Sequence, residues 1–352
     1  MSSTDLVYGS FDSCLGPGTT RFFGSGYKRV VQDLKDITTD GSDRPGALVT
    51  ARGTLTYPQD WSRKSGAREL RPHLSSIDAL VLAVTLAEVH LGRAFGLTAA
   101  QQRRTWLRQA DVRAASSPHE DLADFPVEGR LLTSDGPESA DAAPATSTPT
   151  NPASADSAST STTFSCRVGG LRVRCTLVHE RGGRAEGPAT FADASQALGP
   201  AGARHYGEGY KNRDQYADHV HVDLERQRIQ GRQRIVTEHP GIEAHGAEAA
   251  YGPSVSPVDA LVGVAQLAQA LLYAQDGLTR GRTDTLWMRR FALEARTPVR
   301  PLGRDFATTV RTAGSRLLTM GGETWRTADL AVDDFSGISG HCSLAHRLPT
   351  AA

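Results

Sequence analysis

Two stretches of the chain repeat one another, and this repeat constrains the fold more than any other feature of the sequence. Residues 15–28 are LGPGTTRFFGSGYK and residues 198–211 are LGPAGARHYGEGYK, an offset of 183 positions. A second matching pair, SSID at 75–78 and SPVD at 256–259, has an offset of 181 positions. A match this long, with its internal spacing kept, indicates a tandem duplication, so the chain is predicted to contain two copies of one fold.

The second matching pair opens the two most apolar segments of the chain, residues 76–91 and 256–275. Apolar residues occupy nearly every face of each segment, which predicts a helix wrapped by other structure rather than one lying on a surface. Each begins with a Ser-x-x-Asp capping box, and the second has Pro257 at its first helical position. We therefore predict two buried helices that start alike, with Asp78 and Asp259 in their first turns.

Strand-like segments surround both helices, two before each helix and about three after it. Residues 171–177 are typical, since apolar residues alternate there with Arg172, Arg174 and Thr176. An antiparallel sheet curled round one apolar helix is the hot-dog arrangement, so the predicted fold class is α+β, a tandem double hot-dog. The first domain is predicted to span residues 1–190, with residues 1–28 wrapping it, and the second to span 191–352.

Residues 134–162 are almost entirely small, polar or proline, and they offer nothing with which to build a core. We predict that this segment is a disordered insertion. Because the alternating strand at 171–177 follows it, the insertion interrupts the first domain rather than separating the two.

Composition excludes several classes of partner. The 352 residues include 39 basic and 39 acidic side chains, so the chain lacks the long-range field that attracts nucleic acid or an anionic membrane. The first residues lack the apolar region of a secretory signal, and no apolar run approaches the roughly 20 residues of a membrane span. We expect a cytoplasmic protein. The four cysteines have neither zinc nor disulfide spacing, so we predict no metal site and no disulfides.

The start of the second helix is the predicted active site. Free N–H groups and the positive dipole end of a buried helix can stabilise an oxyanion on a thioester carbonyl. His245 lies 14 residues before Asp259, an order that resembles the His-loop-acid order of hot-dog acyl-thioester dehydratases, with Pro253 where those have a proline. Their polar residue one turn after the acid is replaced by Gly263, and Gln266 follows nearly two turns on. We predict His245 and Asp259 as catalytic and Gln266 as substrate-binding.

Alternatives remain for each of these assignments. Helix capping alone would select an aspartate at position 259, and His239 competes with His245 for the histidine role. Asp78 occupies the same place in the first helix, but Lys64 stands at the position that corresponds to His245, and His73 lies only five residues before Asp78. We therefore predict one active and one supporting half, with Asp78 as a substrate contact.

Three further residues are predicted to bind substrate. Strand alternation places Arg289 on the apolar face beside Trp287 and Phe291, where a guanidinium needs an anionic partner such as a substrate carboxylate or phosphate. A bulge that turns Arg289 outward is the alternative. Tyr27 and Lys28 belong to a repeated Gly-x-Gly-Tyr-Lys segment that predicts a structural turn and can border a pocket.

His219, His221 and Asp223 share one face of a predicted strand. Two histidines and an acid can bind a metal, but no third cluster completes the set. A solvated strand face explains the pattern at lower cost, and we predict no metal there.

The segments LGPGTTRFFGSGYKRV and HLSSIDALVLA, in this order, resemble the AvrD (avirulence D) family of bacterial proteins. The resemblance implies a role in making syringolide-type acyl-sugar lactones, in which a β-ketoacyl chain is joined to a ketopentose such as xylulose. We therefore expect an acyl-condensing enzyme that needs no cofactor. Its expected partners are a sugar acceptor and an acyl thioester on acyl carrier protein or coenzyme A, and a homodimer is possible. A hot-dog dehydratase or thioesterase and a non-catalytic acyl-binding module are the alternatives.

Overall fold

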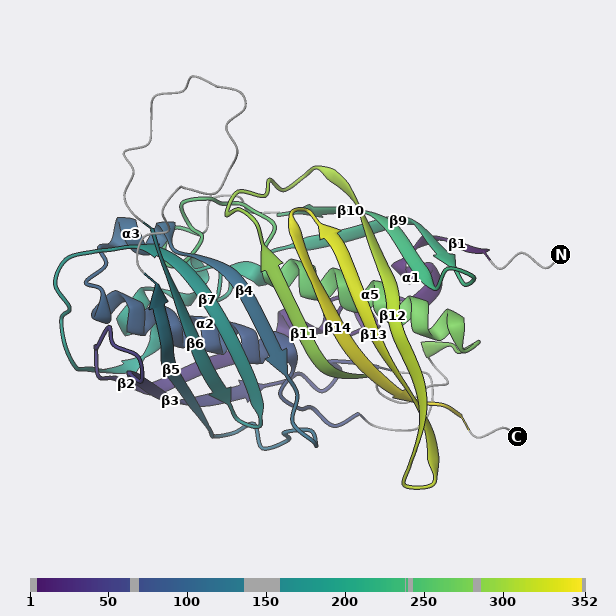
Figure 1. Cartoon of the computed structure of the whole chain (residues 1–352), viewed down its shortest axis with the longest axis horizontal. Helices are drawn as coiled ribbons and strands as arrows, with labels where there is room; N and C mark the ends of the chain where they lie inside the picture. Colours follow the sequence, from purple (N-terminus) through teal and green to yellow (C-terminus); the bar gives the residue numbers. More distant parts are fainter. Residues whose placement is uncertain are drawn as a thin grey trace, which may run out of the picture.

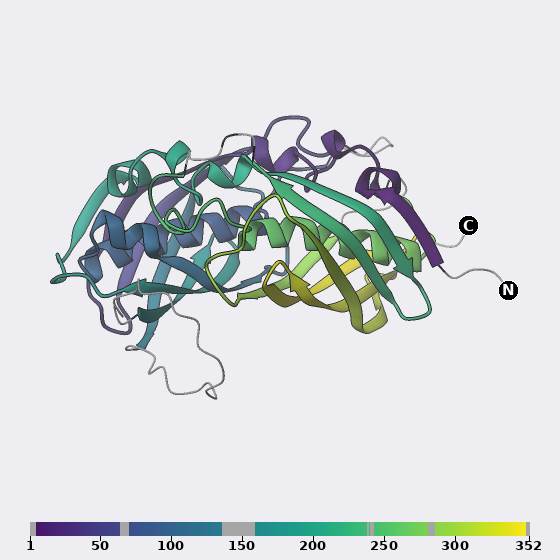
Figure 2. The ribbon, with the colours of Figure 1, turned by 90° about the horizontal axis from the view of Figure 1, so that it is seen from above.

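A computed structural model describes residues 5–63, 70–135, 159–237, 239, 243–280 and 286–349. Over these residues the chain forms one 14-stranded sheet that curls round two long helices (Figure 1). The long helices are α2 (Ser76–Ala94) and α5 (Pro257–Gln275), and nearly all of their side chains are buried. Figure 2 shows them one after the other along the long axis of the molecule.

The remaining elements are short helices and strands. The short α-helices are α1 (Phe11–Leu15), α3 (Ala99–Arg104) and α4 (Ala194–Leu198), and the 3₁₀ helices are η1 (Gly18–Thr20), η2 (Gly26–Arg29), η3 (Ala201–Ala203) and η4 (Gly209–Lys211). The strands are β1 (Asp5–Ser10), β2 (Val31–Thr39), β3 (Leu48–Thr56), β4 (Trp106–Arg113), β5 (Phe125–Asp135), β6 (Ser159–Val168), β7 (Leu171–Glu180), β8 (Ala189–Asp193), β9 (Asp214–Asp223), β10 (Arg228–Val236), β11 (Trp287–Ala295), β12 (Asp305–Met320), β13 (Glu323–Phe335) and β14 (Ile338–Arg347).

The strand order confirms two hot-dog units. It runs β1-β9-β10-β12-β13-β14-β11 in one half and continues as β4-β7-β6-β5-β3-β2-β8 in the other. The halves join where β11 pairs antiparallel with β4, for example at Phe291 with Val112. Each half therefore curls seven strands round one apolar helix, the predicted double hot-dog.

The two copies exchange their first strands. β1, from the start of the first copy, pairs with β9 of the second, and β8, from the start of the second copy, pairs with β2 of the first. The short helices follow the same exchange, since α1 packs on α5 and α4 packs on α2. The expectation that residues 1–28 wrap the first domain is therefore wrong for β1 and α1, which pack on the second half, whereas Phe22 does pack against Tyr57 and Trp61 of the first half. The boundary at residues 190 and 191 falls inside β8, and the division into two domains stays a prediction.

The repeated Gly-Tyr-Lys segments meet where the two halves join. The buried rings of Tyr27 and Tyr210 stack with centroids 6.4 Å apart. The Lys28 ammonium lies 2.7 Å from Asp214, and the Lys211 ammonium donates to the carbonyl of Val30 at 2.7 Å. Each lysine thus reaches a residue of the other copy, which explains why this turn is repeated.

The predicted insertion lies between two neighbouring strands of the first half. β5 continues to Asp135 and β6 begins at Ser159, and the strands pair as far as Asp135 with Ser161. The predicted limits, 134–162, are therefore too wide at both ends, because serine and threonine there extend the strand pair. Residues 136–158 lie outside the described residues.

α5 is long and apolar enough to cross a membrane by length and composition alone, although 83% of that span is buried inside the fold. Its apolar character is therefore accounted for by packing within the sheet. Cys166, Cys175 and Cys342 are buried free thiols, and Cys14 is a half-buried one.

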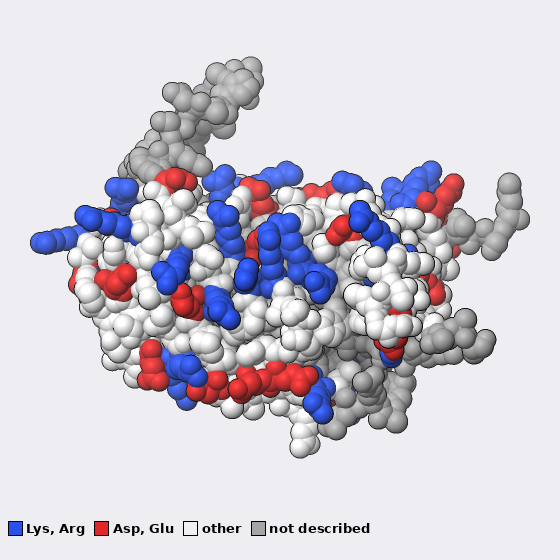
Figure 3. Space-filling view, turned by 60° about the horizontal axis from the view of Figure 1, so that its bottom comes forward, with Lys and Arg blue, Asp and Glu red and all other residues white. Residues whose placement is uncertain are grey.

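Arginines occupy outward-facing positions in the middle of the sheet. In β7, Arg172 and Arg174 are exposed between buried Leu171, Val173 and Cys175, which confirms the predicted alternation. Figure 3 shows Lys and Arg side chains gathered near the middle of the molecule. The sheet therefore presents a cationic outer surface near the join between the halves.

The glycines of the repeated turn are required by close backbone contacts. A Cβ on Gly24 would lie 2.1 Å from the carbonyl oxygen of Gly18, and one on Gly207 would lie 2.3 Å from that of Ala201. Gly202, in the same segment, has nothing within 4 Å of its Cβ position.

We predict that Gly24→Ala and Gly207→Ala each lower the free energy of unfolding by about 3 kcal/mol, because the backbone oxygens that they meet cannot move aside independently. Gly202→Ala is the matched control and should leave stability unchanged or raise it by about 0.5 kcal/mol. Denaturant unfolding of the three variants checks this, and equal stability of all three would contradict it.

Candidate active site

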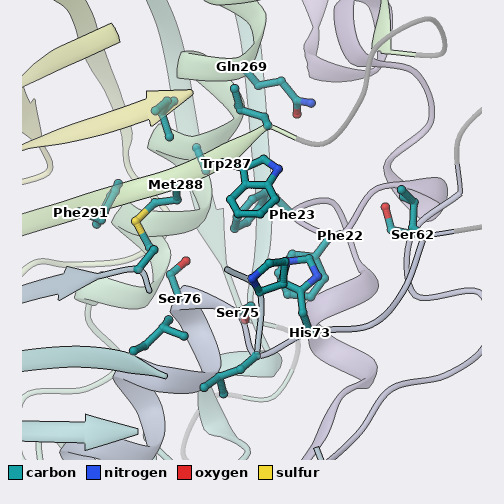
Figure 4. Close-up of a pocket in the computed structure, with 18 of the residues that line it drawn as sticks. Phe22, Phe23, Ser62, His73, Ser75, Ser76, Gln269, Trp287, Met288 and Phe291 are labelled. Atoms are coloured by element: carbon teal, nitrogen blue, oxygen red, sulfur yellow. The ribbon is translucent and has the colours of Figure 1, made fainter. Parts of the chain in front are cut away.

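A cavity of about 540 Å³ opens at the start of α2. Its walls come from both halves of the chain, because the start of α2 and the loop after β4 face α5, β11, β13 and β14 across it. Figure 4 shows Trp287 near the middle of the cavity, with His73, Ser75 and Ser76 gathered on one side of it and Gln269 on the other. The site therefore lies between the two hot-dog units, beside the first helix.

The start of α2 presents free backbone donors to the cavity. The capping box joins Ser75 and Asp78, so the Ser75 hydroxyl accepts from the Asp78 N–H at 3.2 Å. Helix geometry leaves the N–H groups of Ser76 and Ile77 without intrahelical acceptors. Ser76 lines the cavity, so these N–H groups and the positive end of the helix dipole can stabilise negative charge there.

His73 supplies a basic nitrogen beside these donors. Its Nδ1 lies 3.1 Å from the carbonyl oxygen of Arg71, and the ring packs edge-on against Trp61. Because a carbonyl only accepts, Nδ1 donates to it, and Nε2 has no hydrogen-bond partner among the described residues, so the neutral ring carries its lone pair at Nε2. Half-buried His73 lines the cavity, so it is placed to act as a general base.

The opposite side of the cavity is polar where α5 passes. Buried Arg21 donates to the side-chain oxygen of Gln266 and, at 2.5 Å, to Asp12. Burial lowers the pKa of Arg21, and the charge of Asp12 opposes this shift. Gln269 and Arg280 line the same side, and Gln269 donates to the hydroxyl of Tyr273 at 2.9 Å. Arg280 donates to the carbonyl oxygens of Arg63 and Thr20, so the amide of Gln269 is the group on this side that can hydrogen-bond a polar substrate.

The rest of the cavity is largely apolar. The second half contributes a group of hydrophobic side chains to it: Leu261, Leu286, Trp287, Met288, Phe291, Trp325 and Leu344. Cys342 lies among them, and its burial raises the pKa of the thiol to about 12. The thiol therefore stays protonated, and Cys342 is no nucleophile at neutral pH. An alkyl chain fits this wall.

The Asp78 carboxylate is hydrogen-bonded to neighbouring residues. It accepts from the Ser75 backbone at 3.0 Å, from the Ser75 hydroxyl at 2.6 Å and from Gln32 at 2.6 Å, and it also accepts from the hydroxyl of Tyr57. Gln32 in turn accepts from Tyr210 at 3.0 Å. Four donors saturate the carboxylate, so the geometry makes Asp78 the partner of the helix cap.

Asp259 and His245 have separate partners, and no contact joins them among the described residues. The Asp259 carboxylate accepts from the Ser256 backbone at 2.8 Å, from the Ser256 hydroxyl at 2.9 Å and from Gln215 at 3.3 Å. His245 is exposed, and its ring lies against Gly199 while its backbone N–H donates to Ala203 at 3.0 Å. The structure does not bring the two together, and neither lines the cavity described above.

The predicted substrate-binding residues divide into two groups. Gln266 lines the cavity, whereas Tyr27 is buried beside Tyr210 and Lys28 is paired with Asp214. Burial raises the pKa of Tyr27, and the charge of Asp259 raises it further. Arg289 sits at an irregularity between Met288 and Arg290 and is exposed. The structure thus contains the bulge that was the alternative for this strand.

His221 lies 3.5 Å from Asp5 of β1, and Asp223 pairs with Arg226 and Arg228. Within the described ranges, no three His, Cys, Asp or Glu residues are grouped so as to hold a metal ion. His221 thus contacts the neighbouring strand β1, and Asp223 is engaged in ion pairs with arginines.

A buried ionic network occupies the counterpart of the cavity in the second half. Glu243 accepts from Nδ1 of His205 at 3.0 Å and from Arg213 at 2.6 Å. Glu248 accepts from Tyr206 at 3.0 Å and from Arg300 at 3.3 Å. These contacts fix the loop that leads into α5. The corresponding loop of the first half, which leads into α2, lines the cavity instead.

Sequence reasoning missed Arg21, His119 and the whole network around Glu243. Arg21 has a repeated counterpart, Arg204, and this match is the signal that marks it as structurally important. His119 lines the cavity, accepts the backbone N–H of Leu74 at its carbonyl, and has a buried Nε2 with no partner among the described residues. Nothing in the local sequence around His119 marks it.

A family model described as Pseudomonas avirulence D protein (AvrD) matches residues 6–349 of the chain. The chain belongs to the AvrD family. The match confirms the resemblance carried by the two short motifs and extends it across both halves of this family member.

Several solved structures are similar to this AvrD-family chain. A conserved protein of unknown function with hot dog fold from Alicyclobacillus acidocaldarius is 10% identical, with 88% of this chain and 95% of that one covered and a TM-score of 0.35. The pyran synthase domain from module nine of the sorangicin pathway is 15% identical, with 89% and 97% covered and a TM-score of 0.36. The bifunctional dehydratase-cyclase domain in ambruticin biosynthesis is 14% identical, with 90% and 96% covered and a TM-score of 0.30. No curated protein matches the chain at a significant level.

The Glu243 network gives a pH-dependent stability. Burial raises the pKa of Glu243, but the charge and hydrogen bond of His205 outweigh this and lower it from 4.5 to about 2. Because the folded pKa lies below the ordinary one, ionised Glu243 stabilises the fold above pH 4.5, and this contribution is lost as the pH falls toward about 2.

We predict that Glu243→Gln lowers the free energy of unfolding by about 3–5 kcal/mol at neutral pH, because His205 and Arg213 lose their buried counter-charge. The difference from the unsubstituted protein should shrink as the pH falls below 4.5. Denaturant unfolding across this pH range measures it, and a difference that stays constant with pH would contradict the assignment.

Proposed function

We propose that this AvrD-family protein transfers a β-ketoacyl chain from a thioester to a hydroxyl group of a ketopentose such as xylulose. The observation that carries the proposal is the placing of a histidine with a free Nε2 beside the free N–H groups of a buried helix, at one side of a largely apolar cavity. Acyl transfer to a hydroxyl needs these three parts. Family membership supports the acyl and sugar substrates, which the resemblance to AvrD proteins implies.

The acyl chain would lie along the wall formed by Trp287, Met288 and Phe291. Burial of its methylene groups there contributes about 0.8 kcal/mol each. With the chain so placed, the thioester carbonyl faces the start of α2. The polar acceptor would lie toward Gln266 and Gln269, whose side-chain amides bind hydroxyl groups, whereas the Arg280 guanidinium already donates to the carbonyl oxygens of Arg63 and Thr20.

In the reaction, the acceptor hydroxyl gives its proton to Nε2 of His73 as its oxygen attacks the thioester carbonyl carbon. The carbonyl oxygen becomes an oxyanion, which the N–H groups of Ser76 and Ile77 stabilise. Collapse of the tetrahedral intermediate breaks the carbon–sulfur bond. The leaving thiolate takes the proton from His73, and the products are an ester and a free thiol.

The carboxylates favour transfer over dehydration. A dehydratase needs an acid to protonate the departing hydroxyl, but Asp78 and Asp259 are engaged in their helix caps. The acids that do line the cavity, Glu120 and Glu323, have side chains that are each 45% exposed. Both are paired with arginines, Glu120 with Arg71 and Glu323 with Arg347, so neither is placed as a buried acid beside the start of α2.

We predict that His73→Ala lowers kcat by roughly 10²–10⁴-fold, because the acceptor hydroxyl loses its base. His245→Ala is the matched control, an exposed histidine outside the cavity, and should keep full activity. The measurement is mass spectrometry of the product formed from a β-ketoacyl thioester and xylulose.

The catalytic assignment of His245 and Asp259 stays a prediction, and the same experiment decides it. Loss of the sugar-containing product in His245→Ala with activity retained in His73→Ala would overturn the proposed site. Thiol release or loss of water without sugar in the product would indicate a thioesterase or dehydratase. If the unsubstituted protein and its variants all leave the thioester unchanged, the result would indicate a non-catalytic acyl-binding protein.

The apolar wall predicts a dependence on chain length. Ala265 lies on the cavity side of α5 and is only half-buried, so a larger side chain there projects into the cavity. Ala265→Phe should lower kcat/KM for long acyl chains by at least about tenfold and leave short chains nearly unaffected, since one tenfold step corresponds to about 1.4 kcal/mol of lost binding. A uniform loss across chain lengths would contradict this placement of the chain.

A further inference from the structure

Six arginines form one patch on the outer face of the sheet, across the join between the two halves. The arginine patch consists of Arg113, Arg167, Arg172, Arg174, Arg289 and Arg290. Four of them stand opposite one another in register, since Arg290 pairs with Arg113, Arg113 with Arg172, and Arg172 with Arg167. At the usual strand spacing this row extends about 14 Å.

The patch carries more positive charge than its surroundings neutralise. Asp111 binds Arg113 and Arg290, at 3.1 and 2.7 Å. Glu128 stands opposite Arg167 but pairs with Arg130. Within the described part of the chain, Arg167, Arg172, Arg174 and Arg289 have no ion-pair partner. Like charges on directly opposed strand positions destabilise a sheet, so this arrangement has a cost that an external anion would remove.

The patch borders the cavity. In three of its four strands, an arginine of the patch is next in sequence to a residue that lines the cavity. Ala114 follows Arg113, Leu171 precedes Arg172, and Met288 precedes Arg289. Lys and Arg side chains accordingly gather near the middle of the molecule in Figure 3. A partner bound on the patch would therefore stand beside the opening through which a substrate enters.

We propose that the arginine patch docks an acidic acyl carrier protein, which delivers the acyl thioester to the cavity on its flexible arm. This inference rests on the proposed function and selects one of the two carriers that the sequence leaves open. Guanidinium groups bind carboxylates in bidentate pairs, and the local positive potential over the patch orients an acidic partner on it.

The shape of the patch favours a protein over coenzyme A. Its exposed arginines are spread over four strands of a convex sheet face, which matches carboxylates distributed over a helix surface. A nucleotide concentrates its phosphates in one place and is usually held by converging backbone N–H groups at a helix start or glycine-rich loop. The arginines of the patch belong instead to four regular strands, and the patch is made of their side chains rather than of backbone N–H groups.

The test compares three thioesters of the same β-ketoacyl chain: one on an acidic bacterial acyl carrier protein, one on coenzyme A and one on N-acetylcysteamine, which carries no charge. The variant is Arg172→Glu with Arg174→Glu. The matched control is Arg44→Glu, an exposed arginine near the carboxyl end of α2, where Ser42 contacts His90, and so away from the cavity.

For the double variant we expect KM for the carrier-protein thioester to rise at least about tenfold with kcat nearly unchanged, and KM for the N-acetylcysteamine thioester to stay the same. The unsubstituted protein should lose affinity for the carrier thioester as salt rises to about 0.5 M, since the contacts are exposed. Arg44→Glu should behave as the unsubstituted protein does.

If the double variant turns over the N-acetylcysteamine thioester and its KM for the carrier-protein thioester is unchanged, the docking site is overturned and the proposed function stands. An equal rise in KM for the coenzyme A thioester would overturn the choice of a protein partner. If no thioester is turned over, the proposed function fails, and fluorescence anisotropy of the labelled carrier protein then tests docking alone. Salt-sensitive binding that the double variant abolishes would support the patch, and no binding would overturn it.

Discussion

Two helices that are apolar on nearly every face determine the rest of this structure. Such a helix can be stable only if other structure surrounds it, so each copy curls seven strands round its helix, and the copies join edge to edge through β4 and β11. A helix covered along its length can offer backbone donors only at its ends. The start of α2 is where the cover opens, because the cavity reaches Ser75 and Ser76 there. The position of the candidate site thus follows from the burial of the helix.

The duplication provides two such helix starts, and the two have diverged in the loops that lead into them. Ahead of α5, Glu243 and Glu248 form ion pairs with the buried side chains of Arg213 and Arg300, and these pairs fix the loop. Ahead of α2, His73 faces the cavity. A buried charge pair broken by the loss of one partner is costly, so the fixed loop is difficult to open. One copy therefore supplies the cavity at its helix start, while the other supplies the apolar wall and the polar side chains of α5.

The sequence predicts the elements well and the site only in part. Repeat, capping boxes and strand alternation are local patterns, and they predicted both helices and the double hot-dog. The exchange of β1 and β8 depends on which open sheet edge each strand reaches, and no local pattern encodes this. The cavity depends on the register between β11 and its neighbours, where a single bulge turns Arg289 outward. His119 and Gln266 are brought to one cavity by tertiary packing across the join, so spacing along the chain could not relate them.

The capping boxes are shared by both copies, yet they say little about chemistry. Both capping boxes bond their Asp to the backbone N–H and hydroxyl of a serine, and a cap of this kind contributes about 1 kcal/mol to helix stability. Stability alone is therefore sufficient to keep Asp78 and Asp259. The chemistry is expected where the copies differ, at positions that one copy uses for packing and the other leaves free. His73 is such a position, since it lines the cavity and its Nε2 has no partner among the described residues, whereas the loop of the second copy directs its charged groups into ion pairs.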